Sequence, residues 1–103
     1  MDQDRSEGAM TPDTVFWRRQ ERDDILKEVI KASQEVDRVA LIYGELYEFL
    51  GDRRDKHSRA AMDSIGDRLT KAQEELDMLF SRLSDAHRAV VLARAEADEI
   101  AAN

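Results

Sequence analysis

The chain of 103 residues has a formal net charge of -7, with 38% charged and 42% hydrophobic residues. This length fits one domain with little interior, and the low content of proline, glycine and aromatic residues favours long helices over sheets. The negative charge disfavours direct binding to nucleic acids or anionic lipids, and the absence of cysteine excludes disulfides and cysteine-ligated metals. No stretch approaches the roughly 20 apolar residues of a membrane span, so we expect a cytoplasmic protein.

The N-terminal region is expected to change from a tail to a helix near residue 11. Residues 1–10 contain almost nothing to bury and predict a disordered tail. Thr11 can accept a free backbone N–H group, Pro12 suits the first helical position, and Asp13 favours the positive end of a helix. We therefore predict a first helix over residues 11–50.

Two apolar stripes dominate the sequence, and each follows alternating steps of four and three residues. The first stripe consists of Ile25, Val29, Ala32, Val36, Val39, Tyr43, Leu46 and Leu50. The second stripe consists of Met62, Ile65, Leu69, Ala72, Leu76, Leu79, Leu83, Ala86, Val90, Ala93, Ala97 and Ile100. Such steps place an apolar seam along a helix, as in coiled coils. We expect these seams to hold the helices of an oligomer together.

The two seams cannot belong to one continuous helix. Leu50 and Met62 would share a heptad position, yet their separation is not a multiple of seven residues. Gly51 is placed to end the first helix, and residues 51–56 form a polar tip. The chain must therefore turn between the two seams.

A second helix is predicted over residues 57–101. Either Asp55 or Ser58 can cap its start. Because the connection is short, the two helices should be antiparallel neighbours. Residues 11–103 are thus expected to form one all-α domain, a long antiparallel helical hairpin of the coiled-coil type.

Apolar side chains outside the seams point to a further layer of helices. In the first helix they are Leu26, Ala40, Ile42, Tyr47 and Phe49, and in the second they are Met78, Phe80, Val91 and Leu92. An apolar arc wider than a two-helix seam needs another helix to cover it, and the simplest source is a second copy. We predict a homodimer that forms a four-helix bundle.

Candidate partner-binding residues lie at the start of the first helix and near its end. Phe16, Trp17, Arg18 and Arg19 either dock a partner, since Trp and Arg are enriched at binding hot spots, or close the bundle end against residues 90–100. Closer to the tip, Leu41 falls on the outer face of the helix and Tyr47 flanks the seam. A bundle neighbour or a partner would cover them, although a single exposed Leu is ordinary.

Sequence signatures of common enzymes are not found in this chain. It contains no glycine-rich phosphate loop, no Ser-His-Asp set and no HExxH motif. His57 and His87 have no carboxylates spaced to complete a tetrahedral metal site with them. We therefore expect no catalytic residue, cofactor or metal.

One enzyme alternative comes from the acidic stretches 44–49 and 74–77. They resemble motifs of the MazG-like all-α nucleoside triphosphate pyrophosphohydrolases, in which paired carboxylates on neighbouring helices hold Mg²⁺ against the nucleotide. The resemblance implies that the metal ligands would be Glu45, Glu48, Glu74 and Asp77. Ile42 stands where the family has its leading Glu. A tip at residues 51–56 would also bring Glu74 opposite Ser33 rather than Glu45.

The function expected from the sequence is that of a non-enzymatic protein–protein interaction module, which is an adaptor, an assembly factor or an acidic inhibitor of a larger partner. The long seams without a chemical constellation favour it over the MazG-like alternative. The acidic surface suits a protein partner with a basic face.

Overall fold

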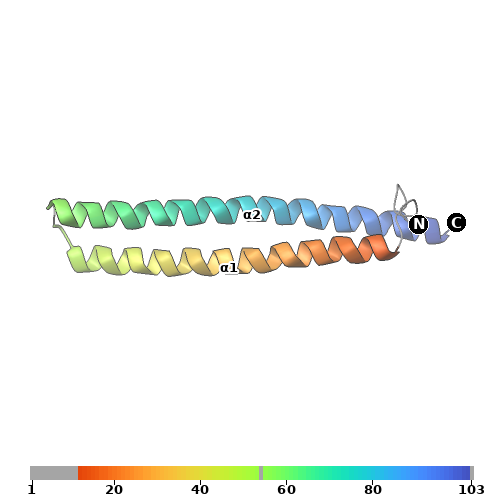
Figure 1. The fold of residues 1–103 in the computed structure, drawn as a ribbon, viewed down its shortest axis with the longest axis horizontal. Helices are drawn as coiled ribbons and strands as arrows, with labels where there is room; N and C mark the ends of the chain where they lie inside the picture. The colour runs from red at the N-terminus through yellow and green to blue at the C-terminus, as the bar shows by residue number, and fades with distance from the viewer. Residues whose placement is uncertain (1–11, 54, 103) are drawn as a thin grey trace, which may run out of the picture. The chain divides into compact units, whose positions relative to one another are not determined.

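The computed structural model describes residues 12–53 and 55–102. It contains two α-helices, α1 (Pro12–Leu50) and α2 (Lys56–Ala102), which run in opposite directions and are joined by a short turn (Figure 1). This confirms the all-α antiparallel helical hairpin predicted from the sequence. The tail predicted at residues 1–10 and the Thr11 cap lie outside the described residues. Dimerisation into a bundle stays a prediction.

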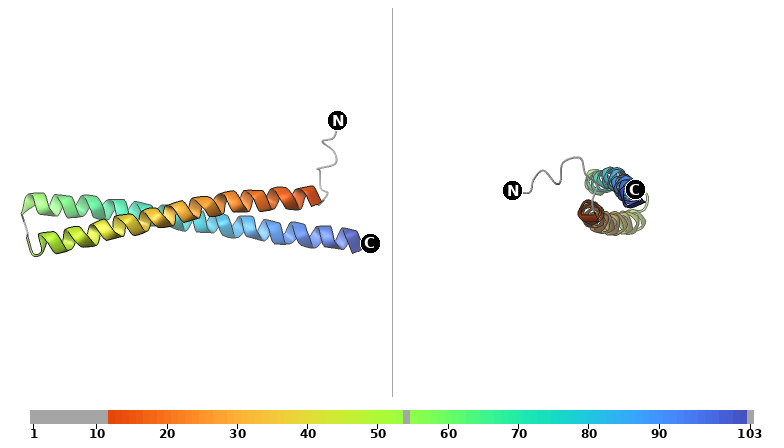
Figure 2. Two further views of the ribbon diagram at one scale, coloured as in Figure 1. Left: turned by 90° about the horizontal axis from the view of Figure 1, so that it is seen from below. Right: turned by 90° about the vertical axis from the view of Figure 1, so that its right-hand side faces the viewer.

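The chain divides into two compact units, and each combines a segment of α1 with a segment of α2. The first unit is Met1–Lys27 with Phe80–Asn103, and the second unit is Glu28–Leu79, which contains the turn. In both units the two helical segments lie side by side (Figure 1, Figure 2).

The interior of each unit is a single layer of seam side chains. In the first unit the buried members are Val15, Ile25, Val90 and Ala93, and in the second they are Val29, Val39 and Leu79. Two packed helices cover few side chains completely, and only Val39 and Ala93 are as little as 1% exposed. The remaining seam positions are half-buried, apart from Ile100 near the end of α2, which is exposed.

The seam of α1 extends further towards the N-terminus than its apolar residues suggest. Val15 is buried at the position that continues the heptad pattern, and Arg22, at an intervening seam position, is half-buried. An arginine can lay its aliphatic stem along an apolar surface and keep its charged group in water. Arg22 therefore continues the packing where an apolar residue is missing.

Gly51 ends α1, as predicted. Its φ is +58°, a left-handed backbone conformation that residues other than glycine adopt at a cost in free energy. Its backbone N–H donates to the Tyr47 carbonyl at 2.9 Å. A Cβ atom on Gly51 would meet nothing within 4 Å. Backbone conformation alone therefore favours glycine at this position.

Asp55 caps the start of α2, which settles the choice between Asp55 and Ser58. One carboxylate oxygen accepts the backbone N–H of Ser58 and the other accepts the Ser58 hydroxyl, both at 2.9 Å. The Arg53 side chain also donates to Asp55, at 3.2 Å. Ser58 is itself buried, so its polar groups depend on Asp55 for these hydrogen bonds.

The pKa of Asp55 is lowered, chiefly by the backbone N–H of Ser58, then by the Ser58 hydroxyl and the Arg53 guanidinium, against an opposing effect of desolvation. Because this pKa is lower in the folded chain than in the unfolded chain, the cap stabilises the fold above the unfolded pKa of about 4. Its contribution is lost as the pH falls through the folded pKa. We expect Asp55→Ala to lower the thermal unfolding midpoint near neutral pH and to differ less from the wild type below about pH 4.

Thermal unfolding followed by circular dichroism across this pH range measures the effect. Asp67→Ala, which removes an exposed aspartate from the body of α2, serves as the control and should show a smaller difference at neutral pH. A difference for Asp55→Ala that stays constant down to about pH 2 would contradict the cap as its source.

Within the described residues, neither helix has an apolar stretch long enough to cross a membrane.

Candidate interaction surfaces

The seam divides the surface of each unit into two flanks. With the seam residues at heptad positions a and d, the first flank consists of positions b and e and the second flank of positions c and g. On the first flank of the second unit, the Tyr43 ring of α1 approaches Gly66 of α2, which is at position e. A Cβ atom added to Gly66 would lie 3.6 Å from this ring. Across the seam, Glu35 and Arg68, both at position g, form an ion pair at 3.9 Å. Like positions of α1 and α2 thus meet on the same flank.

The predicted seam residues lie between the helices, and they differ in how fully they are covered. Val39 and Leu79 are buried. The others are half-buried, and they are Val36, Tyr43, Leu46, Leu50, Leu69, Leu76 and Leu83. Partial exposure of so many seam positions is the direct result of having only two helices in the layer.

A hollow opens on the first flank of the second unit, beside the turn. It has a volume of about 300 Å³, and its walls include Tyr43, Tyr47, Arg59 and Asp63. Tyr47 is 62% exposed at its edge. The hollow is therefore bordered by aromatic and charged groups.

Charged residues are sparse along this first flank. Ile30 is exposed at position b. The aspartates at positions b are Asp37, Asp63 and Asp77, and none forms an ion pair with a described residue. Among the described residues, the cations at b or e positions of the second unit are Lys56 and Arg59, both exposed and both close to the turn. The flank thus combines apolar side chains with unpaired charges of both signs, the cations lying near the turn.

The second flank of the second unit is densely charged with both signs. Glu35 accepts hydrogen bonds from Arg38 on its own helix, the shorter at 2.8 Å, and also pairs with Arg68. A hollow of about 360 Å³ on this side is lined by Glu28, Lys31 and Glu75 among others. These charges largely compensate one another.

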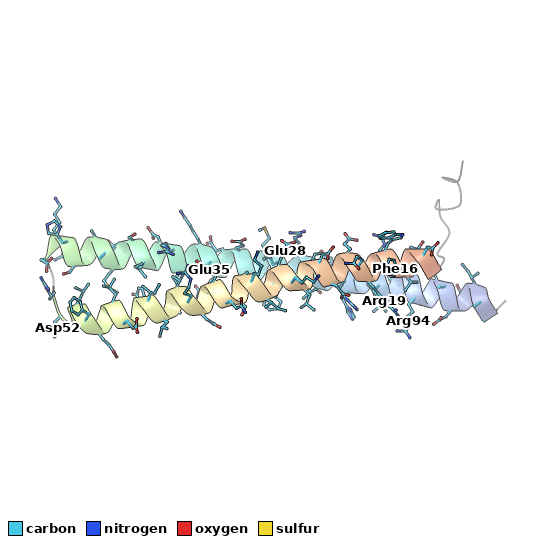
Figure 3. All side chains as sticks on the ribbon, turned by 60° about the horizontal axis from the view of Figure 1, so that its bottom comes forward. Phe16, Arg19, Glu28, Glu35, Asp52 and Arg94 are labelled. Carbon is cyan, nitrogen blue, oxygen red and sulfur yellow. The ribbon has the colours of Figure 1, made fainter. Side chains whose placement is uncertain are left out.

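The first flank of the first unit presents arginines beside apolar side chains. Arg19 on α1 and Arg94 on α2 are exposed, and neither forms an ion pair with a described residue (Figure 3). Phe16 and Val91, at positions b of the two helices, are also exposed. Arg94 was not among the candidates from the sequence; the heptad position it shares with Arg19 is the signal that identifies it.

Arg22 and His87 connect the two helices on this flank. An Arg22 nitrogen lies 3.5 Å from Nδ1 of His87, and the guanidinium also donates to Asp23 at 3.1 Å. Asp23 is therefore engaged by Arg22. Asp98 near the end of α2 is the other carboxylate at a b or e position of the described first unit.

Phe16 and Trp17 are both exposed, by 56% and 64%. Their rings contact edge to face, with centroids 5.2 Å apart. Trp17 is at position c, which belongs to the second flank. Arg18 pairs with Glu21 at 3.5 Å and lines a hollow of about 270 Å³ on that flank. Within the described residues neither ring is covered, so both are accessible to a partner or to a second copy.

Leu41 is 63% exposed at position f, the outer face of α1, as the register predicts. Tyr47 lies closer to the turn, at position e on the first flank of the second unit. The two candidates thus occupy different faces of α1, and a single flat contact on one flank would reach Tyr47 but not Leu41.

The acidic pairs of the MazG-like alternative lie in the second unit and are exposed: Glu45, Glu48, Glu74 and Asp77. Since Glu35 pairs with Arg68, Glu74 lies further from the turn than that pair, whereas Glu45 lies closer to it. No three acidic or histidine side chains gather as a metal site among residues 12–53 and 55–102. The two carboxylate pairs therefore occupy different levels of the helix pair.

No protein-family model, curated protein or solved structure matches this chain.

Proposed function

We propose that this protein is a non-enzymatic protein–protein interaction module that works as a helical-bundle oligomer. It serves as an adaptor, an assembly factor or an acidic inhibitor of a larger partner. One observation carries the proposal, namely the set of large apolar side chains left exposed: Phe16, Trp17, Leu26, Ile30, Leu41, Tyr47, Phe49, Met78, Phe80, Val91, Leu92 and Ile100.

These side chains outnumber the buried apolar residues of the two units. Each square ångström of apolar surface removed from water contributes about 25 cal/mol, so covering several large side chains strongly favours association. Large apolar patches on a small protein typically mark an interaction site. A second copy supplies the further helices, and a larger partner can occupy what the second copy leaves open.

The charge of the chain supports a partner with a basic face. The formal net charge is -7, and most of the unpaired carboxylates described above lie in the second unit. Complementary charge speeds association and favours particular partners. Binding of a basic partner should therefore weaken as the salt concentration rises. The absence of cysteine supports a place in the reducing cytoplasm.

The solution mass, measured by light scattering during size exclusion, tests the proposal. The protein is measured over a series of concentrations, with and without Mg²⁺ and a mixture of nucleoside triphosphates whose turnover is followed. We expect a dimer or a larger oligomer that is indifferent to the metal and releases no pyrophosphate. A monomer at every concentration would contradict the oligomer.

Release of pyrophosphate would overturn the non-enzymatic proposal. In that event Glu45→Gln with Glu48→Gln should abolish the Mg²⁺-dependent hydrolysis and leave the helical signal unchanged. For the interaction module, the same double variant should keep both its fold and its solution mass, because both side chains are exposed.

A further inference from the structure

The first flank of the second unit has mostly small side chains in its middle and larger groups at both ends. The small residues at its b and e positions are Ser33, Ala40, Gly44, Gly66 and Thr70. A Cβ atom on Gly44 would meet nothing within 4 Å, so the surface there is open. Because the distance between packed helices depends on the side chains at the contact, this flank allows another helix pair to approach closely.

The two ends of this flank differ in shape and in charge. At the end beside the turn lies the hollow of about 300 Å³, whose walls include Tyr47 and Arg59. At the other end Ile30 is 51% exposed, and Asp77 is exposed as well. Neither Arg59 nor Asp77 forms an ion pair with a described residue. One end is thus concave with an unpaired cation, and the other end is apolar with an unpaired carboxylate.

Two contacts show which residues of α1 and α2 lie at the same level of the second unit. Glu35 pairs with Arg68 at 3.9 Å, and the Tyr43 ring approaches Gly66. The part of α1 across from Gly66 and Arg68 is therefore the part between Glu35 and Tyr43. Its centre is Val39, so Val39 of α1 and the residues around Arg68 of α2 share one level in the middle of the flank.

The ends of the flank are spaced symmetrically about this level. On α1, Ile30 and Tyr47 lie at nearly equal distances along the chain on either side of it. On α2, Asp77 and Arg59 lie equally far from Arg68. A two-fold axis at this level, perpendicular to the helices, therefore places Ile30 of one copy against Tyr47 of another. The same operation places Asp77 of one copy against Arg59 of the other.

We propose that a second copy of this chain docks on the first flank of the second unit, through the same flank and in the opposite direction. The inference rests on the proposed function, because it names the partner and the surface of the oligomer. Ile30 of each copy enters the hollow beside the turn of the other, next to Tyr47. Asp77 of each copy pairs with Arg59 of the other, so two ion pairs form by symmetry.

The polar residues between these ends are also accommodated. Gln73 of one copy lies against Asp63 of the other and can donate a hydrogen bond to its carboxylate. Asp37 lies against the small Ala40 and gains no opposite charge. Lys56 lies next to the turn, outside the contact. The unpaired charges at the two ends of the flank are thus the ones that the contact joins.

The size of this surface suits a specific dimer. The stretch from Ile30 to Tyr47 is roughly 25 Å long, and two helices side by side are about 20 Å wide, which gives a footprint of roughly 500 Å² on each copy. Two such surfaces reach the lower bound of about 1,000 Å² for a specific interface. The contact lies wholly within the second unit.

The same flank also offers a parallel contact, in which the two-fold axis runs along the helices and each residue meets the level it occupies itself. Arg59 and Tyr47 share one level, since both line the hollow beside the turn, so they would meet between copies. Asp77 would lie against Ile30, because residues 28–35 line the hollow on the second flank together with residues 75 and 79. Only the antiparallel contact joins an unpaired carboxylate to an unpaired cation, so charge favours it.

An exchange of charge between two positions tests this contact. Arg59→Glu alone and Asp77→Arg alone each place like charges in both symmetry-related pairs, so we expect each to weaken self-association by about 10- to 100-fold. The double variant Arg59→Glu with Asp77→Arg rebuilds both pairs with the signs exchanged and should associate like the wild type. The two positions are roughly 27 Å apart along α2, so this rescue cannot arise within one copy. Sedimentation equilibrium at low salt measures the dissociation constants.

Lys71→Glu and Glu74→Arg are the matched controls. They make the same changes in charge at exposed positions c and f of α2, away from the first flank, and should associate like the wild type. All four positions are exposed, so every variant should keep the helical circular dichroism of the wild type.

Each other outcome overturns the contact. If the wild type is an oligomer and both single variants associate as tightly as it does, the proposed surface is wrong and the proposed oligomer stands. If the single variants are weakened and the double variant is not rescued, the antiparallel pairing of Asp77 with Arg59 is wrong. If the wild type is monomeric at every concentration, both the contact and the oligomer of the proposed function fail.

Discussion

Val39→Asp is expected to unfold the second unit, with a loss of about 3–5 kcal/mol in the free energy of unfolding. Val39 is 1% exposed, in the middle of the seam between α1 and α2. A carboxylate in its place would lose its water without gaining a partner, because the neighbouring seam positions are apolar. A small domain is stabilised by only about 5–15 kcal/mol, so this loss is a large part of the total.

Leu41→Asp is the matched control for this substitution. Leu41 lies two residues further along α1 but is 63% exposed, so its aspartate stays in water. Urea unfolding followed by circular dichroism should place Leu41→Asp close to the wild type and Val39→Asp far below it. Equal losses for the two variants would show that the interior of the second unit is not the seam described above.

Ala93→Leu is expected to destabilise the first unit by about 1–3 kcal/mol, although it adds apolar volume. Ala93 is also 1% exposed and lies in the seam of α2. Small seam residues allow the helices to approach closely, and the added carbons of leucine must push the helices apart or adopt strained rotamers. The sign of the effect is thus opposite to that expected from hydrophobicity alone.

The same substitution at Ala95 provides the comparison. Ala95 lies on the outer face of α2 and is exposed, so Ala95→Leu should change the free energy of unfolding by less than about 0.5 kcal/mol. Urea unfolding of both variants at one protein concentration measures the difference. A stabilised Ala93→Leu would mean that the helices leave a space around Ala93, contrary to its burial.

The helices and their seams are predictable from the sequence because the spacing of apolar residues is a local property of the chain. Steps of three and four residues place side chains on one face of a helix in any surroundings. The turn is predictable for a similar reason: the mismatch between Leu50 and Met62 excludes a continuous helix, and Gly51 suits the left-handed conformation. The exposure of Leu41 also follows from its heptad position.

The pairings between the helices are less accessible to sequence reasoning. Arg22 interrupts an apolar pattern, yet it continues the packing and approaches His87 on the other helix. The sequence left both Asp55 and Ser58 as candidates for the cap of α2, because either residue type can accept a backbone N–H group. The geometry of the turn brings the Asp55 carboxylate within hydrogen-bond distance of the Ser58 N–H group and hydroxyl. Such contacts depend on the offset between α1 and α2.

Arg94 and the three aspartates of the first flank escape a search along the sequence because each is an ordinary charged residue among many. Asp37 belongs to α1, whereas Asp63 and Asp77 belong to different turns of α2. They share a flank only when α1 and α2 are placed side by side in opposite directions. The surface candidates near Phe16 and Tyr47, by contrast, stand out by residue type.

The sequence by itself determined two helices, the side of each helix that is apolar, and the point at which the chain must turn, since all three depend on local periodicity and on the conformational range of glycine. Only the tertiary structure decided which residues of α1 lie across from which residues of α2, as Glu35 and Arg68 show. Charges on one helix become compensated or uncompensated through that pairing. The physical reason is that a helical repeat specifies the face a side chain occupies, whereas its neighbour on another helix depends on the length and geometry of the turn.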